Sequence, residues 1–166
     1  MTVLIMRGLP GSGKTFRANE LIGNSLSVSL VSASHFFMVD GEFKFDASKA
    51  QEAHTDCFAR FLAAAKEGWK KPIVVDNTNS TSWEISPYIA AARVYGHSVG
   101  IIEVSAELEQ CLMDNTHAVP KRVMMAMNHR LDMPLPASFP KTLLVKRDID
   151  RDDFRSAVAA FKESEW

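Results

Sequence analysis

The chain has 166 residues, 46% of them hydrophobic, and its 19 Lys and Arg residues nearly balance its 20 Asp and Glu residues. This size and composition favour one compact domain over residues 1–166, and the near-neutral charge argues against bulk attraction to nucleic acid or membrane while leaving room for a local basic face. No run of about 18 apolar residues occurs, and Cys57 and Cys111 lack the spacing of a zinc site or redox motif. We therefore expect a cytoplasmic protein with reduced cysteines and no membrane partner.

Residues 8–15 read GLPGSGKT and match the phosphate-binding pattern GxxxxGK(S/T). The apolar run at 3–6 predicts a buried parallel strand before this loop, and apolar residues at helical spacing predict a helix from Thr15 to Gly23 after it. In that setting Lys14 is expected to reach the β- and γ-phosphates of ATP, and the Thr15 hydroxyl to ligate Mg²⁺. The alternative is a glycine-rich turn with no ligand. The residues expected to bind ATP are Leu9, Pro10, Gly11, Ser12, Gly13, Lys14, Thr15 and Phe16.

A second strand is expected over residues 27–31, and it leads to Ser34 and His35. Ligands of open α/β sheets bind at the carboxyl ends of the strands, so these two side chains are candidates for acceptor binding. A helix follows from about residue 47 to 66, with an apolar stripe that includes His54. On that stripe we interpret His54 as a core histidine rather than a catalytic one.

A third buried strand at 72–75 is followed directly by Asp76, and then by Asn77 and Asn79. A carboxylate in this place beside a phosphate loop can hold Mg²⁺ or orient an attacking hydroxyl, and the two amides can bind the acceptor. The alternative for Asp76 is an N-cap of the next helix, a role that residues 80–82 fill equally well.

The rest of the chain continues the alternation of helices and strands. Helices are expected at about 83–95, 106–115, 120–131 and 150–162, and strands at 99–104 and 142–145. Of the basic residues at 120–131, Lys121, Arg122 and Arg130 lie off the apolar stripe. The expected fold is an α/β three-layer sandwich with a five-stranded parallel sheet, and right-handed crossovers place the phosphate loop, Ser34 and Asp76 at one edge.

Four blocks in this order resemble one family. They are GLPGSGKT (8–15), SASHFFMVDGEFKFDASKAQEAH (32–54), VVDNTNSTSWEISPY (74–88) and NTHAVP (115–120) leading to Arg130. Over residues 3–131 the chain resembles the polynucleotide-kinase-like P-loop kinases, an AAA-domain kinase family with zeta toxins as distant relatives. The resemblance implies a phosphotransferase that uses ATP and Mg²⁺, with Asp76 near the acceptor and a helical lid at about 106–131. It also implies a hydroxyl acceptor, such as the 5′-OH of a polynucleotide or a hydroxymethylated base such as 5-hydroxymethyluracil in DNA.

The chain departs from the family pattern at three positions. Ser34 stands where the family has an Asp that accepts the proton of the acceptor, and Asp114 and Ala126 stand where the lid carries Arg. Arg122 and Arg130 remain as lid cations. Since a serine hydroxyl cannot take a proton at neutral pH, either a neighbour such as His35 or Asp40 does so, or transfer proceeds without a strong base.

These observations predict a kinase that binds a nucleoside triphosphate and phosphorylates a nucleic-acid or nucleoside hydroxyl. The alternatives are an ATP-hydrolysing switch protein with a weakened transfer site and a small-molecule kinase of the same fold. The residues expected in catalysis are Lys14, Asp76, Ser34, His35 and Arg130. Those expected at the acceptor are Ser34, His35, Asn77, Asn79 and Arg122, and those at the metal are Thr15 and Asp76. The oligomeric state is left open by the sequence.

Overall fold

The computed structural model describes residues 2–23, 28–67 and 72–165. These residues form a five-stranded sheet with the order β2-β5-β1-β6-β7, in which every neighbouring pair is parallel. The strands are β1 (Thr2–Arg7), β2 (Ser29–Val31), β5 (Ile73–Asp76), β6 (Ser98–Ser105) and β7 (Thr142–Lys146). The predicted parallel sheet is therefore confirmed, and the expected strand start at Ser27 lies outside the described residues.

Helices connect the strands. The α-helices are α1 (Lys14–Ile22), α2 (Ala50–Lys66), α3 (Ser82–Val94), α4 (Leu108–Met113), α5 (Lys121–Leu131) and α6 (Arg151–Glu165). Between β2 and α2 lie the 3-10 turns η1 (Ala33–Phe37) and η2 (Ala47–Lys49) and a small antiparallel hairpin of β3 (Met38–Val39) and β4 (Glu42–Phe43). No helix among the described residues has the length and apolar character needed to cross a bilayer.

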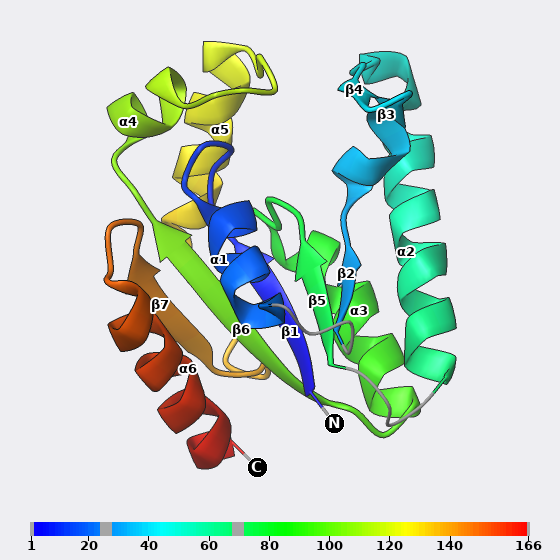
Figure 1. Ribbon diagram of the computed structural model, residues 1–166, viewed down its shortest axis with the longest axis vertical. Helices are drawn as coiled ribbons and strands as arrows, with labels where there is room; N and C mark the ends of the chain where they lie inside the picture. Colours follow the sequence, from blue (N-terminus) through cyan, green and yellow to red (C-terminus); the bar gives the residue numbers. More distant parts are fainter. Residues whose placement is uncertain (1, 24–27, 68–71, 166) are drawn as a thin grey trace.

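Strand β1 is buried on both faces, as its continuous apolar run predicts. Val3 and Ile5 pack into one core with α2 and α3, whereas Leu4 and Met6 pack into a second core with α1 and α6. The sheet is thus sandwiched between two helical layers (Figure 1). Both Cys57 and Cys111 are buried and unpaired.

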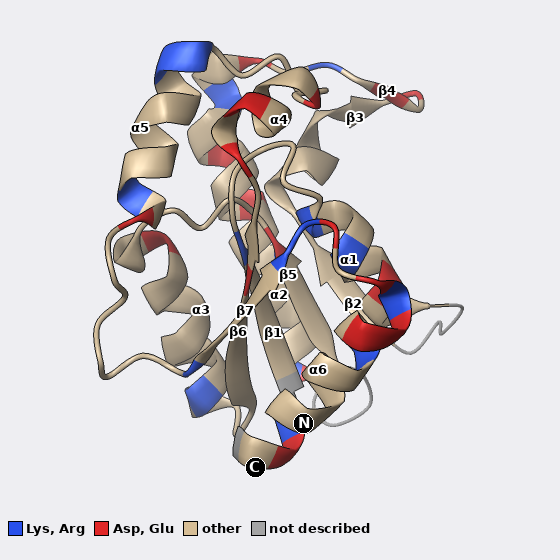
Figure 2. Cartoon of the chain, turned by 90° about the vertical axis from the view of Figure 1, so that its left-hand side faces the viewer, with Lys and Arg blue, Asp and Glu red and all other residues tan. Residues whose placement is uncertain are grey.

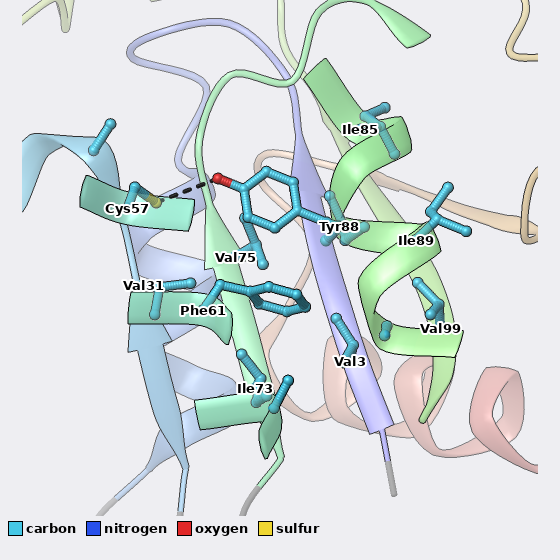
Figure 3. Packing of buried hydrophobic residues seen from close by; sticks show 14 of the residues in the cluster. Val3, Val31, Cys57, Phe61, Ile73, Val75, Ile85, Tyr88, Ile89 and Val99 are labelled. Carbon is cyan, nitrogen blue, oxygen red and sulfur yellow. Dashed lines mark hydrogen bonds between the residues drawn. The ribbon is translucent and has the colours of Figure 1, made fainter. Parts of the chain in front are cut away.

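The core between the sheet, α2 and α3 carries a small polar network that reaches the carboxyl ends of the strands, which we call the ligand edge. The Tyr88 hydroxyl donates to Cys57 Sγ at 3.4 Å (Figure 3), and burial raises the pKa of this tyrosine. Asn77 Nδ2 donates to both Tyr88 Oη and Cys57 Sγ at 3.4 Å, and Asn77 Oδ1 accepts from the Ala33 amide at 2.9 Å. Asn77 therefore links the ends of β5 and β2 through the core.

Strand register decides which residues meet at the ligand edge. Asp76 of β5 pairs with Met6 of β1, which is two residues before the start of the phosphate loop at Gly8. Asp76 therefore lies beside the base of that loop. The β3–β4 hairpin stands on one side of this edge and helices α4 and α5 stand on the other (Figure 1). The fold therefore builds a site between two small appendages above the carboxyl ends of the strands.

Candidate active site

The phosphate loop needs glycine at two positions, and at each of them both the backbone conformation and the lack of space require it. Gly8 has a φ of +144° and a Cβ there would lie 2.5 Å from the Val104 carbonyl oxygen. Gly11 has a φ of +79° and a Cβ there would lie 2.5 Å from the Cys111 carbonyl oxygen. The loop therefore packs tightly against β6 and α4, in a backbone conformation that only glycine adopts without strain.

Lys14 begins α1 and is 8% exposed. Its Nζ donates to the Leu9 carbonyl oxygen at 2.6 Å, so the ammonium curls over the loop. Burial lowers the pKa of Lys14 to about 8, and the nearby Asp76 carboxylate opposes this shift. A buried cation without a full counter-charge is prepared to receive an anion.

Thr15 and Asp76 are in direct contact. The Thr15 hydroxyl donates to Asp76 Oδ2 at 2.6 Å, while Asp76 Oδ1 is buried without a hydrogen-bond partner. These oxygens fit Mg²⁺, which takes one or two protein ligands and completes its shell with phosphates and water. Among the described residues no group of three or more His, Cys, Asp or Glu side chains lies together as a metal site.

The alternative role of Asp76 as a helix cap is wrong. Asp76 is the last residue of β5, and α3 is capped by Thr81, which forms a capping box with Glu84. Glu84 Oε2 accepts from the Thr81 amide at 2.8 Å and from the Thr81 hydroxyl at 2.9 Å. The Asp76 side chain is thus left to the cleft beside the phosphate loop.

A cleft of about 720 Å³ opens beside the phosphate loop. Of the residues expected to bind ATP, six line this cleft: Pro10, Gly11, Gly13, Lys14, Thr15 and Phe16. The other two loop residues expected to bind ATP, Leu9 and Ser12, are buried, at 3% and 0% exposure, and do not line the cleft. The opposite end of the cleft is formed by η1, the β3–β4 hairpin, α2 and α5.

Ser34 lines this cleft, but its neighbour His35 does not. Ser34 Oγ lies 2.8 Å from Ser32 Oγ. On the 3-10 turn η1, the His35 side chain is exposed and its Nδ1 lies 3.2 Å from a guanidinium nitrogen of Arg60. Burial and the Arg60 charge both lower the pKa of His35. The predicted role of His35 at the acceptor is therefore not met in this structure, because successive residues of the turn point in different directions. Asp40 on the hairpin turn also lies outside the lining.

The two predicted acceptor amides have different surroundings. Asn77 lines the cleft, although both ends of its amide are already bonded within the fold. Asn79 is 3% exposed, has a φ of +48° and donates from Nδ2 to the Met6 carbonyl oxygen at 2.7 Å. Asn79 therefore fastens the loop after β5 to β1 and is corrected from an acceptor ligand to a structural residue.

The predicted cations of α5 also lie outside the cleft lining. Lys121 and Arg122 begin the helix and Arg130 is its second-last residue, and blue segments mark both ends of α5 in Figure 2. Arg130 Nε donates to the Ala126 carbonyl oxygen at 3.1 Å. The face of α5 toward the cleft is apolar and consists of Val123 and Met127. In this structure Arg122 and Arg130 therefore do not reach the place expected for the phosphates.

Sequence reasoning missed Arg147, which follows β7 and lines the cleft. Its guanidinium donates to the Gly11 carbonyl oxygen at 2.7 Å and pairs with the Asp114 carboxylate. Hydrogen bonds from Gln110 and Arg147 hold the pKa of Asp114 below its usual range. The unexpected Asp114 thus brings a distant arginine to the phosphate loop, a pairing that no local sequence pattern marks.

Two histidines line the cleft that we did not assign to it. His54 was expected in the core, but its side chain is exposed and the adjacent Ala53 takes the buried position. His117 lies on the loop between α4 and α5 and stacks on Phe43 of the hairpin, with ring centroids 4.2 Å apart. Burial and the charge of Lys14 lower the pKa of His117, against an opposing effect of Asp76.

A phosphate loop between β1 and α1 of a parallel sheet, with Thr15 and Asp76 in contact beneath it, defines a kinase-like P-loop nucleotide-binding fold. The chain belongs to the AAA domain family AAA_33, whose profile matches residues 3–134.

Two human proteins share sequence with it over part of their length. NEDD4-binding protein 2 is 36% identical over 102 residues, which are 60% of this chain and 6% of that protein. YLP motif-containing protein 1 is 25% identical over 138 residues, which are 69% of this chain and 6% of that protein. The chain therefore spans about 6% of the length of these curated relatives.

Solved structures share the fold over most or nearly all of the chain. Kti12 of Chaetomium thermophilum in complex with ADP-AlF3 has a TM-score of 0.69 at 17% identity, over 99% of both chains. The APS kinase CysC of Mycobacterium tuberculosis, in complex with AMPPNP and APS, has a TM-score of 0.62 at 15% identity, over 98% of this chain and 97% of that one. A chain of the Pnkp1/Rnl/Hen1 RNA repair complex has a TM-score of 0.64 at 18% identity, over 79% and 44%. These likenesses show the fold, and Kti12 and CysC hold nucleotides.

Proposed function

We propose that the protein transfers the γ-phosphate of ATP to a hydroxyl group on a nucleic acid or nucleoside. The observation that carries this proposal is one continuous cleft lined by Lys14, Thr15, Asp76 and Ser34. A donor on the phosphate loop and an acceptor beside Ser34 therefore share a single compartment. Phosphoryl transfer needs mainly positioning and electrostatic stabilisation, and these residues supply both.

In the proposed step, the acceptor oxygen forms a bond to the γ-phosphorus while the bond from that phosphorus to the β–γ bridging oxygen breaks. ADP leaves with the bond electrons, and the hydroxyl proton is released to solvent. Lys14 would offset charge on the β- and γ-phosphates, and Thr15 and Asp76 would hold Mg²⁺. When bound, Mg²⁺ neutralises part of the phosphate charge.

We propose that residues 106–131, with α4 and α5, act as a lid over the phosphates. The backbone supports this, because Gly11 packs against the carbonyl groups of Cys111 and Asp114 at the end of α4. Arg147 joins the same contact from the other side through Gly11 and Asp114. A shift of this segment would therefore change the contacts of the phosphate loop directly.

For the acceptor we retain a 5′-OH of a polynucleotide or a hydroxymethylated base such as 5-hydroxymethyluracil. The blocks at 32–54 and 74–88, which resemble polynucleotide-kinase-like enzymes, support this choice of acceptor. An aromatic lining at the far end of the cleft suits a nucleobase.

A second candidate is an ATP-hydrolysing switch, and Ser34 is the observation that favours it. The carboxylates among the described residues of the cleft lining are Asp76 and Asp114. In the proposed site Asp76 holds the metal together with Thr15, and Asp114 pairs with Arg147, so neither carboxylate is assigned as the base for an acceptor hydroxyl. A cleft without a strong base suits slow hydrolysis as well as slow transfer.

The deciding experiment uses γ-labelled ATP with Mg²⁺ and panels of 5′-OH oligonucleotides, hydroxymethylated DNA, nucleosides and sugars. Label in a nucleic acid or nucleoside supports the proposal. Free phosphate alone favours the switch, and label in a sugar favours a small-molecule kinase. Lys14→Ala serves as the inactive control.

A further inference from the structure

The end of the cleft away from the phosphate loop is aromatic. Phe37, Phe43 and Phe45, which we call the aromatic wall, line this end. Phe37 meets Phe43 and Phe45 edge-on, at centroid distances of 6.0 and 4.9 Å. Val123 and Met127 of α5 line the cleft as well, so much of its lining is apolar.

His117 extends the aromatic wall from the other side of the cleft. Its ring stacks on Phe43 at 4.2 Å with an interplanar angle of 26°. The loop that carries it is held in shape by Asn115, whose Nδ2 donates to the Val119 carbonyl oxygen at 2.7 Å and whose Oδ1 accepts from the Val119 amide at 3.0 Å. The His117 ring therefore lies on a loop that is closed by these two hydrogen bonds. Through the His117–Phe43 stack, the hairpin and the α4–α5 loop are in contact.

The charges of the cleft are unevenly placed. Among the described residues that line it, the cations are Lys14 and Arg147, and the carboxylates are Asp76 and Asp114. Both cations contact the phosphate loop, at the Leu9 and Gly11 carbonyl oxygens. No Lys or Arg of the described lining belongs to the aromatic wall or its surroundings on α2 and α5. A phosphodiester placed there would be desolvated without a cation, which is strongly unfavourable.

We infer that the aromatic end of the cleft is an acceptor site for an uncharged nucleoside unit, so that free nucleosides suffice as acceptors. This inference rests on the proposed function, and it names the substrate class of that site. The planar base packs on the aromatic wall, as bases pack on aromatic side chains elsewhere, and the sugar hydroxyl points toward Ser34 and the phosphate loop. Any phosphate attached to the nucleoside stays outside the cleft.

The test measures binding and transfer separately. Binding of thymidine and adenosine to the protein loaded with Mg·AMPPNP is measured by calorimetry, beside the corresponding nucleoside 3′-monophosphates and a short 5′-OH oligonucleotide. We expect the affinity for nucleosides to be independent of salt concentration. We also expect the nucleoside 3′-monophosphates to bind no more tightly than the nucleosides. Phe43→Ala should weaken nucleoside binding about tenfold, the size of one lost base stack, and leave AMPPNP affinity within about twofold.

Trp83→Ala is the matched control, because this tryptophan of α3 is 71% exposed and does not line the cleft. It should change neither affinity. If Phe43→Ala does not fold, Phe45→Ala replaces it, since this ring is already 53% exposed.

Three results would overturn the inference: no nucleoside binding, an oligonucleotide affinity that far exceeds that of nucleosides and falls steeply with salt, or unchanged nucleoside affinity in the folded aromatic variant. Transfer assays with γ-labelled ATP keep the two proposals apart. Nucleosides that bind at the aromatic wall without receiving label support the site and count against the kinase. Label that enters oligonucleotides and never nucleosides supports the kinase and counts against this inference.

Discussion

The Thr15 hydroxyl lies 2.6 Å from Asp76 Oδ2 and joins the first turn of α1 to the last residue of β5. The two residues are 61 positions apart in the sequence, and the parallel register of β1 and β5 brings them together. Because Asp76 Oδ1 is buried without a partner, the pair forms an incomplete oxygen site at the phosphate loop.

The first prediction concerns this carboxylate. Asp76→Asn keeps the shape of the side chain and an oxygen for Thr15, so the melting temperature should stay within a few degrees. Turnover with Mg·ATP should fall by about 10²-fold or more, as for a lost catalytic carboxylate. Asp152→Asn, an exposed change at the start of α6, should alter neither quantity. A large loss of stability with normal turnover would contradict the catalytic assignment of Asp76.

How far the sequence predicts this site depends on whether a feature is local. The loop GLPGSGKT and the apolar run before it predicted the strand, the loop and the helix, because each depends on residues close in the chain. Asp76 was expected directly after the third strand and is in fact its last residue, so the sequence placed it at the correct edge of the parallel sheet. His35 was misplaced, because the 3-10 turn η1 sends adjacent side chains in different directions and strand alternation does not describe it.

Long-range pairs were beyond prediction from the sequence. Arg147 reaches Asp114 and Gly11 across 33 and 136 positions of sequence, and no periodicity marks such a contact. Asn79 resembles an acceptor ligand in the sequence, yet its amide is taken by the Met6 carbonyl group. Side chains that complete the fold and side chains that bind ligands have the same chemistry, so only three-dimensional placement distinguishes them.

The second prediction is a pH dependence of ATP binding. Burial lowers the pKa of Lys14 to about 8 in the free protein, while bound phosphates favour the ammonium form and raise it. Binding near pH 8 should therefore take up roughly half a proton, and affinity should fall as pH rises above about 8, by up to about tenfold per pH unit. Calorimetry in two buffers of different ionisation enthalpy measures the uptake.

Lys14→Met is the control for this pH dependence, since it should bind ATP weakly and without this proton uptake. The free protein gives a second check on the sign. Because the folded pKa lies below the value of 10.5 in an unfolded chain, the contribution of Lys14 to stability should improve as pH rises from about 8 to 10.5. Wild-type binding with no proton uptake at any pH near 8 would contradict the burial of this ammonium.

The third prediction concerns the ion pair of Asp114 and Arg147 at the phosphate loop. Both side chains are partly exposed, at 41% and 33%, so their interaction is modest. Arg147→Ala should weaken ATP binding several-fold by removing a cation from the cleft. Asp114→Asn should strengthen it by about two- to tenfold, because it removes a negative charge and frees the guanidinium for the phosphates.

A double-mutant cycle with ATP affinity as the readout checks the coupling. In the Arg147→Ala background, Asp114→Asn should give a smaller gain, since no guanidinium is left to release. Equal gains in both backgrounds would mean that the two side chains act independently on ATP.

The fourth prediction concerns Arg7, which is 3% exposed and pairs with Glu103 of β6. Its guanidinium also donates to the carbonyl oxygens of Leu131, the last residue of α5, and of Met133 just beyond it, at 3.2 and 3.4 Å. Arg7 immediately precedes the phosphate loop, so it ties the end of α5 to that loop. Glu103→Gln leaves a buried cation without its counter-charge and should lower the free energy of unfolding by up to about 3 kcal/mol.

Urea denaturation gives the stability, and hydrogen exchange at residues 128–133 should accelerate in Glu103→Gln. Replacing both partners, by Arg7→Met with Glu103→Leu, should recover part of the stability because no charge stays buried. Exchange that accelerates uniformly over the whole chain, instead of at the end of α5, would contradict a local anchoring role for Arg7.

The last prediction concerns Ser34, which lines the cleft where the resembling family has an aspartate. Ser32 Oγ lies 2.8 Å from Ser34 Oγ, so a carboxylate at position 34 would find a hydroxyl donor beside it. A general base contributes about 10²–10⁴-fold, and Ser34→Asp should therefore raise transfer to a hydroxyl acceptor by at least about tenfold with little change in ATP affinity. His35→Ala should leave transfer unchanged, because His35 lies outside the cleft beside Arg60. If Ser34→Asp does not change the rate of transfer while ATP binding and the fold survive, the acceptor hydroxyl does not bind beside Ser34. If His35→Ala slows transfer, η1 must turn its side chains toward the cleft when substrate binds.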